Sequence, residues 1–170
     1  KSLDNFDLNV PGYSEKEQLS LQMAFNATNH YAQNPEGWLL LEGAYGCGKT
    51  HLAAAVGNYR LEKGDQVLFI TTPDLLDHLR ASYAPNSAST YDETFERLRE
   101  AGILIIDDLG VENPSEWAQE KMFQLLNHRY SHRKATIITT NRELDSLDPR
   151  IRSRLLDVNV IHHISIHAQD

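Results

Sequence analysis

Cysteine, long apolar runs and net positive charge are all scarce in this 170-residue chain. Cys47 is the only cysteine, so no disulfide can form within the chain, and we expect a protein of the reducing cytoplasm. The apolar runs, such as residues 103–106, are far too short to cross a bilayer, so we expect no membrane span. No basic start followed by an apolar stretch opens the chain, so we expect no secretory signal.

The charge of the chain is acidic overall but uneven along the sequence. The formal net charge of −8 argues against a protein that coats nucleic acid with its whole surface. No acidic residue falls between Lys121 and Lys134, and further arginines follow in the segment LDPRIRSRL, residues 147–155. Solvated faces on separate helices would also explain such clusters.

Apolar runs rich in branched residues alternate with helical patterns. The runs that predict strands are residues 38–41, 67–71, 103–107, 136–140 and about 160–166. The first four are almost continuously apolar, which is expected of strands that are covered on both faces. Capping pairs at Ser14 with Glu17 and at Thr90 with Glu93 predict two helix starts. Strands that alternate with helices imply right-handed crossovers, so we predict a three-layer α/β domain with a mostly parallel sheet.

The segment GAYGCGKT, residues 43–50, follows the first predicted strand, opens a predicted helix and fits the P-loop pattern in full. Its glycines permit backbone angles that turn successive amides toward one point, where the helix N-terminus adds its positive end. Lys49 is expected on the β- and γ-phosphates and Thr50 on Mg²⁺, whereas Cys47 is interpreted as a packing residue. The predicted nucleotide-binding residues are Gly43, Ala44, Tyr45, Gly46, Cys47, Gly48, Lys49, Thr50 and His51. A chance glycine-rich turn is the alternative, which the strand before it and the helix after it disfavour.

Two further strand ends carry the polar groups that a P-loop site needs. ILIIDD, residues 103–108, predicts that Asp107 anchors Mg²⁺ through its water shell and that Asp108 polarises the attacking water. TIITTN ends in Asn141, a neutral group that is expected to touch the γ-phosphate or the water. A strand end capped by two acidic residues without function is the alternative.

The order of these motifs resembles that of the AAA+ ATPases: P-loop, Asp-Asp strand end, strand-terminal Asn141 and then the basic segment 147–155. The stretches GWLLLEGAYGCGKTHLAAAV and ILIIDDLG are similar to those of the DnaC/DnaI-type bacterial helicase loaders, and the likeness covers nearly the whole chain. The resemblance implies a five-stranded sheet in the order 5-1-4-3-2, ATP and Mg²⁺ as cofactors, and ATP hydrolysis in the service of DNA replication.

The resemblance also implies partners and further site residues. Arg154 would reach into the ATP site of the next subunit of a homo-oligomer, with Arg150 and Arg152 as nearby candidates for the same task. A surface salt bridge is the alternative role for Arg154. Phe6 would pack near the nucleotide base. The implied partners are a replicative ring helicase and single-stranded DNA, which would bind along residues 121–134 or around Arg80 and Tyr83.

The chain departs from the family pattern in two respects. Many AAA+ relatives have Glu where this chain has Asp108, and the shorter side chain leads us to expect slow hydrolysis that assembly or DNA stimulates. Residues 1–170 are interpreted as the AAA+ core, a fragment without an N-terminal helicase-binding region and without most of a C-terminal lid.

Other functions fit parts of the same sequence. An IstB-type transposition helper ATPase shares the signatures, a small-molecule kinase also begins with a P-loop, and a non-hydrolysing module would use nucleotide as a structural ligand. His128 and His132 stand one helical turn apart, a spacing that suits a metal, but no third ligand is evident and a polar helix end is the simpler interpretation.

Overall fold

A computed structural model describes residues 1–81, 88–110 and 115–167, with the backbone alone for residues 81 and 88–92. The strands are β1 (Trp38–Gly43), β2 (Val67–Thr71), β3 (Ile103–Asp107), β4 (Ala135–Thr140) and β5 (Ile161–Ile166). They form one sheet in the order β2-β3-β4-β1-β5, and every neighbouring pair is parallel. This is the predicted order 5-1-4-3-2 counted from the other edge, so the predicted fold class and strand order are confirmed.

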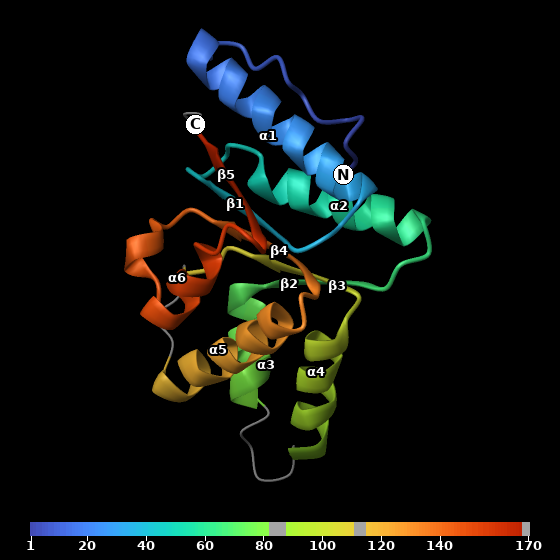
Figure 1. Ribbon diagram of the computed structural model, residues 1–170, viewed down its shortest axis with the longest axis vertical. Coiled ribbons are helices and arrows are strands. Elements are labelled where there is room, and N and C mark those ends of the chain that lie inside the picture. The colour runs from blue at the N-terminus through green and yellow to red at the C-terminus, as the bar shows by residue number, and fades with distance from the viewer. Residues whose placement is uncertain (82–87, 111–114, 168–170) are drawn as a thin grey trace.

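Helices cover both faces of the sheet. They are α1 (Glu15–Gln33), α2 (Lys49–Glu62), α3 (Thr72–Ala81), α4 (Ala88–Glu100), α5 (Glu116–Ser131) and α6 (Pro149–Leu155), with a 3₁₀ turn η1 (Leu144–Ser146). Figure 1 shows α1 and α2 on one side of the sheet and α3, α4 and α5 on the other, so that apolar side chains fill a layer on each face. No described helix is long and apolar enough to cross a membrane.

The predicted helix starts differ in outcome. At α1 both bonds of the capping box form, because the Ser14 hydroxyl accepts from the Glu17 amide and the Glu17 carboxylate accepts from the Ser14 amide. The predicted start at Thr90 is wrong, since α4 begins at Ala88 and Thr90 lies inside the helix. Ser115 caps α5, whose predicted start near Asn113 and Pro114 lies outside the described residues.

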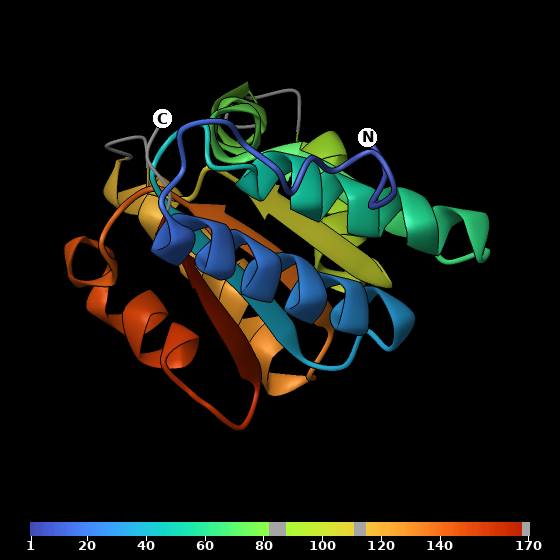
Figure 2. The same cartoon turned by 90° about the horizontal axis from the view of Figure 1, so that it is seen from above.

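Strand burial separates the centre of the sheet from its edge. All residues of β3 are buried, whereas every residue of β2 is half-buried or exposed and Phe69 is 46% exposed. The expectation that β2 is covered on both faces is met in part, because Leu68 and Ile70 pack against one apolar layer and Val67 against the other. Among the described strands β2 pairs with β3 alone, and at this edge of the sheet Phe69 stays exposed. The central strands β1, β3 and β4 run in parallel, so their carboxyl ends reach one edge together (Figure 2). This carboxyl edge positions the site.

Candidate nucleotide-binding site

The P-loop connects β1 to α2 at the carboxyl edge of the sheet. Gly46 and Gly48 have φ of 75° and 97°, in the left-handed region that favours glycine, as the sequence predicts. Gly43 is required for a different reason: a Cβ there would lie 2.8 Å from the Ile166 carbonyl oxygen and 2.9 Å from the Cys47 sulfur. Its small size, and not an unusual backbone angle, lets the loop pass this close to β5.

The ammonium group of Lys49 lies beneath the loop. Lys49 is 5% exposed, and its Nζ donates to the Ala44 carbonyl oxygen at 2.6 Å and approaches the Cys47 sulfur at 3.6 Å. Cys47 itself is buried in the apolar layer between the sheet and α1–α2. In the described part of the chain Lys49 forms no ion pair. A buried charge is costly unless an opposite charge approaches it, so this position favours an anion.

The Asp107 carboxylate accepts hydrogen bonds from the hydroxyl groups of two threonines. Thr50 Oγ1 donates to Asp107 Oδ1 at 2.9 Å and also lies 3.1 Å from Oδ2. Thr139, on β4, donates to Asp107 Oδ1 at 2.6 Å. A Thr hydroxyl next to a carboxylate supplies the hard oxygen ligands that Mg²⁺ prefers beside phosphates. Thr50 and Asp107 therefore lie close enough to serve one metal ion, directly or through its water shell.

Asp108 follows Asp107 in an unusual backbone conformation. Its φ is 60°, and its amide donates to Thr139 Oγ1 at 2.9 Å. Partial burial, together with the charge of Asp107, raises the pKa of the Asp108 carboxyl, while Lys49 acts in the opposite direction. A non-glycine residue in the left-handed region is uncommon, and such residues gather at functional sites.

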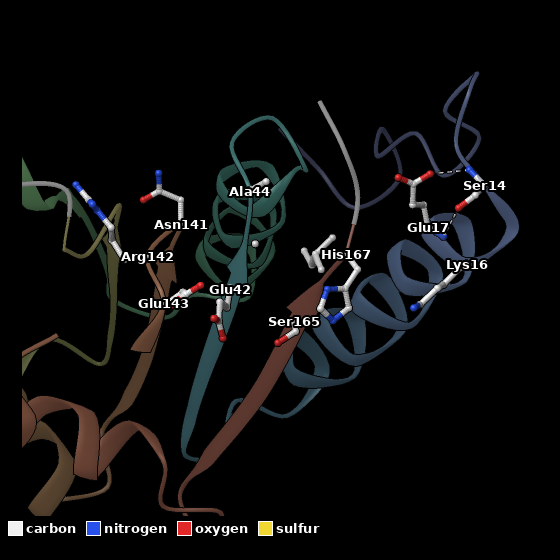
Figure 3. A pocket seen from close by; sticks show the side chains of 12 residues that line it. Ser14, Lys16, Glu17, Glu42, Ala44, Asn141, Arg142, Glu143, Ser165 and His167 are labelled. Carbon is white, nitrogen blue, oxygen red and sulfur yellow. Dashed lines mark hydrogen bonds between the residues drawn. The ribbon is translucent and has the colours of Figure 1, made fainter. Parts of the chain in front are cut away.

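Asn141 directly follows β4 and lines an open cleft of about 670 Å³. Figure 3 shows Asn141 and Ala44 at the ends of neighbouring strands on the rim of this cleft, with the N-terminal turn of α1 opposite. Asn141 Oδ1 is buried and has no hydrogen-bond partner among the described residues. An orphaned polar atom beside the P-loop is suited to a ligand or a water molecule in the cleft.

The N-terminal segment packs on the start of α2. A Cβ on Gly48 would lie 2.9 Å from the Phe6 ring, which also meets the His51 ring edge-on, with 5.2 Å between the ring centroids. His51 Nε2 lies 3.0 Å from the Ser2 carbonyl oxygen. The structure thus brings Phe6, Gly48 and His51 together, whereas the side chain of Tyr45 is exposed.

The three arginines of α6 have different partners. Arg150 pairs with Asp148 and Glu120, and these carboxylates raise its pKa. Arg152 approaches Asp145 at 3.5 Å.

Arg154 lies over the rings of Phe123 and Tyr130, 4.8 and 5.8 Å from their centroids, and its Nε donates to Asn127 Oδ1 at 2.8 Å. Its other bonds are to neutral oxygens, and among the described residues it forms no ion pair. Arg154 is therefore the arginine of α6 whose charge is left without a carboxylate.

The basic stretch from residue 121 to 134 is not a continuous surface. Arg129 is 0% exposed and donates to backbone carbonyls at the end of α4 and the start of β4, and burial lowers its pKa to about 10. Lys134 pairs with Glu100 at 3.3 Å. The prediction of a DNA track that includes Arg129 is wrong. Of the other predicted location, Arg80 pairs with Asp77 at 3.4 Å and Tyr83 lies outside the described residues.

His128 of α5 and His132, which caps the C-terminus of that helix, stack on each other with 4.2 Å between their ring centroids. Both ring nitrogens of His128 already have partners, Glu100 at 2.9 Å and Arg99 at 3.0 Å. Across the described residues, no group of three or more His, Cys, Asp or Glu side chains is placed to hold a metal ion. The pair ties α5 to the end of α4.

Sequence reasoning missed Thr139, which contacts both aspartates. The signal was present in the paired threonines of TIITTN, because polar residues at the end of a buried strand need partners on the neighbouring strand. Thr140 acts similarly, since its hydroxyl donates to the Leu109 carbonyl oxygen at 2.7 Å.

The fold and this site define the class of the protein: an AAA+ P-loop domain. A family model described as IstB-like ATP binding protein matches residues 1–169, and the chain belongs to that family. DnaC, the replicative helicase loader of Buchnera aphidicola subsp. Baizongia pistaciae, is 26% identical over 156 residues, which cover 92% of this chain and 61% of that protein. DnaC of Escherichia coli K12 is 27% identical over 137 residues, 79% of this chain and 56% of that protein.

Solved structures show the same likeness. The crystal structure of the DnaC helicase loader superimposes with a TM-score of 0.81 at 25% identity and covers 98% of this chain and 96% of that one. AMPPCP-bound DnaA from Aquifex aeolicus has a TM-score of 0.79 at 21% identity, over 99% of this chain and 50% of that one, and shares the fold. The chain spans less than two thirds of the length of the DnaC sequences that it matches.

Proposed function

We propose that this chain is the ATP-hydrolysing domain of a replicative helicase loader. The observation that carries the proposal is the buried ammonium group of Lys49 inside a complete P-loop, where it forms no ion pair with any described residue and lies in the same site as the Thr50–Asp107 pair. The likeness to DnaC over nearly the whole of a solved loader chain supports the choice among AAA+ functions.

Each group at the carboxyl edge has a distinct role in this proposal. Lys49 and the amides of the loop bind the phosphates, and Thr50 with Asp107 holds Mg²⁺. When bound, Mg²⁺ neutralises charge on the phosphoryl oxygens. Asp108 orients the attacking water. The orphaned Asn141 Oδ1 accepts a hydrogen bond from that water, or the Nδ2 of the same amide group donates to the γ-phosphate. Phe6 packs near the base, on the far side of Gly48.

Hydrolysis is completed by a second copy of the chain. Charge accumulates on the transferring phosphoryl oxygens, and a guanidinium inserted in trans stabilises it. Arg154 is preferred over Arg150 and Arg152 because those two already face carboxylates of their own chain. In this proposal ATP favours assembly, and the assembly grips single-stranded DNA and delivers a ring helicase.

The second candidate is a transposition helper ATPase, which the family description favours. Both functions use the same nucleotide site and the same assembly, but they differ in the protein partner. A loader associates with a ring helicase, whereas a helper acts on DNA together with a transposase.

The test is phosphate release from ATP by the purified chain, alone, with single-stranded DNA, and with the ring helicase of the same organism. We expect slow release that rises with protein concentration and with DNA, and helicase that is loaded onto a DNA circle. ATP binding without any release under all conditions would contradict an ATPase. Release without helicase loading would favour the transposition helper.

A further inference from the structure

The hydroxyl group of Thr139 joins the two aspartates of the site. Thr139 is 0% exposed and lies at the carboxyl end of β4, next to the end of β3. Its Oγ1 accepts the Asp108 amide at 2.9 Å and donates to Asp107 Oδ1 at 2.6 Å. A hydroxyl group can accept one hydrogen bond while it donates its single proton in another, so Thr139 can bond the Asp108 amide and the Asp107 carboxylate at the same time.

We propose that Thr139 is a positioning residue that holds Asp107 and Asp108 as one unit for Mg²⁺ and water. This inference rests on the proposed function and adds to it a residue on a different strand. Thr139 itself touches neither phosphate nor metal in this proposal; it acts through the two carboxylates.

The backbone around Asp108 explains why such a residue is needed. A φ of 60° is costly for a side chain such as aspartate and persists when surrounding contacts hold it. Backbone bonds hold the next residue as well, since the Leu109 amide donates to the Thr139 carbonyl oxygen at 2.9 Å. Thr139 therefore fixes both Asp108 and Leu109, and with them the direction of the Asp108 carboxylate.

The same hydroxyl gives Asp107 a partner that does not depend on the metal. Thr50 also donates to Asp107, but Thr50 is itself a candidate metal ligand. If Mg²⁺ takes the Thr50 oxygen, Thr139 is the hydroxyl that remains on Asp107. Thr139 thus keeps the carboxylate oriented in both states of the site.

The experiment compares three single substitutions on β4. Thr139→Val replaces the hydroxyl by a methyl group of similar shape, and Thr139→Ser keeps the hydroxyl. Thr136→Val is the control, because Thr136 is also a buried threonine of β4 and lies three residues before Thr139. Its hydroxyl bonds Arg129 and the Lys134 carbonyl and neither aspartate. The readouts are the affinity for a fluorescent ATP analogue with and without Mg²⁺, and kcat and KM for hydrolysis.

For Thr139→Val we expect affinity without Mg²⁺ to stay within about twofold of wild type. Its Mg²⁺-dependent gain in affinity and its kcat should fall about 10- to 100-fold, the range for losing hydrogen bonds to a charged group. Thr139→Ser should recover both to within about threefold, and Thr136→Val should lower thermal stability without changing the Mg²⁺ dependence. Circular dichroism checks folding, and Thr139→Ala replaces the valine variant if that one does not fold.

Three outcomes would overturn the inference. A valine variant with wild-type Mg²⁺ dependence and kcat would show that the hydroxyl is dispensable. A serine variant as impaired as the valine variant would assign the effect to packing. Equal loss in Thr136→Val would mean a general destabilisation of β4. In each case wild type still binds and hydrolyses ATP, so the proposed function stands; a wild-type chain that binds no nucleotide would remove both.

Discussion

Two polar regions of this molecule are built in opposite ways. At the carboxyl edge, Thr139 bonds both the Asp107 carboxylate and the Asp108 amide across two strands, and the buried Lys49 forms no ion pair with any described residue. On α6, by contrast, Arg154 stacks on aromatic rings, and its charge is paired with no carboxylate of the described residues. The proposed function places phosphate beside the first region and assigns to the second region a charge that acts on it from another subunit.

The same comparison distinguishes two neighbouring arginines of α6. Arg150 lies beside Arg154 and stacks on the same Phe123 ring, at 4.2 Å, but its charge is matched by Asp148 and Glu120. The two arginines therefore differ in their ion pairs: Arg150 is paired with carboxylates of its own chain, whereas Arg154 forms no ion pair with any described residue. Stacking orients Arg154 without neutralising it, because an aromatic ring is attracted to a cation but carries no charge.

The largest expected effect comes from Lys49→Ala, which removes the buried ammonium group from the site at the carboxyl edge. Removing one partner of a buried charge pair costs roughly 2–5 kcal/mol, so ATP affinity should fall about 100-fold or more. Turnover should drop to background at every protein concentration. Equilibrium binding of a fluorescent ATP analogue and phosphate release measure the two effects, and unchanged circular dichroism excludes unfolding. Near-normal affinity would contradict the assignment of the P-loop.

A smaller and more selective effect is expected from Arg154→Ala, which breaks the second region alone. ATP affinity in dilute solution should remain within about twofold, while turnover at high protein concentration should fall on the order of 10³-fold, the scale of a trans arginine. Arg150→Ala is the matched control and should lose far less turnover, since its charge is already paired. Equal turnover in the Arg154 variant at all concentrations would contradict the trans role.

The smallest effect is expected from Asn127→Ala, which leaves both regions in place. The substitution removes the acceptor of the Arg154 Nε bond, so the guanidinium keeps its charge but loses part of its orientation. Loss of one hydrogen bond predicts about a fivefold decrease in concentration-dependent turnover and no change in ATP affinity. The concentration dependence of phosphate release is the measurement, and a change in affinity would show that α5 influences the nucleotide site directly.

Only part of the site at the carboxyl edge could be predicted from the sequence. The P-loop glycines and the position of Asp107 beside Thr50 were predictable because short contiguous patterns mark them, and the strand order follows from the family resemblance. The bond from Thr139 to Asp107 was not, because it joins residues 32 positions apart and depends on the register of two strands.

Which charged residues are buried could not be predicted from the sequence either. Arg129 looks like a surface cation in the sequence, but its partners are backbone carbonyls that only the tertiary structure brings together. For the same reason, the separation of Arg154 from Arg150 depends on Glu120, which lies on another helix.

The most direct test of the proposed trans role of Arg154 is to mix the Lys49→Ala and Arg154→Ala variants. Lys49→Ala lacks a working nucleotide site but keeps Arg154, and Arg154→Ala lacks the arginine but keeps its site. Phosphate release should be near background for each variant alone and should rise on mixing, because the arginine of one chain can then serve the site of the other. A mixture no more active than the sum of its parts would contradict the account.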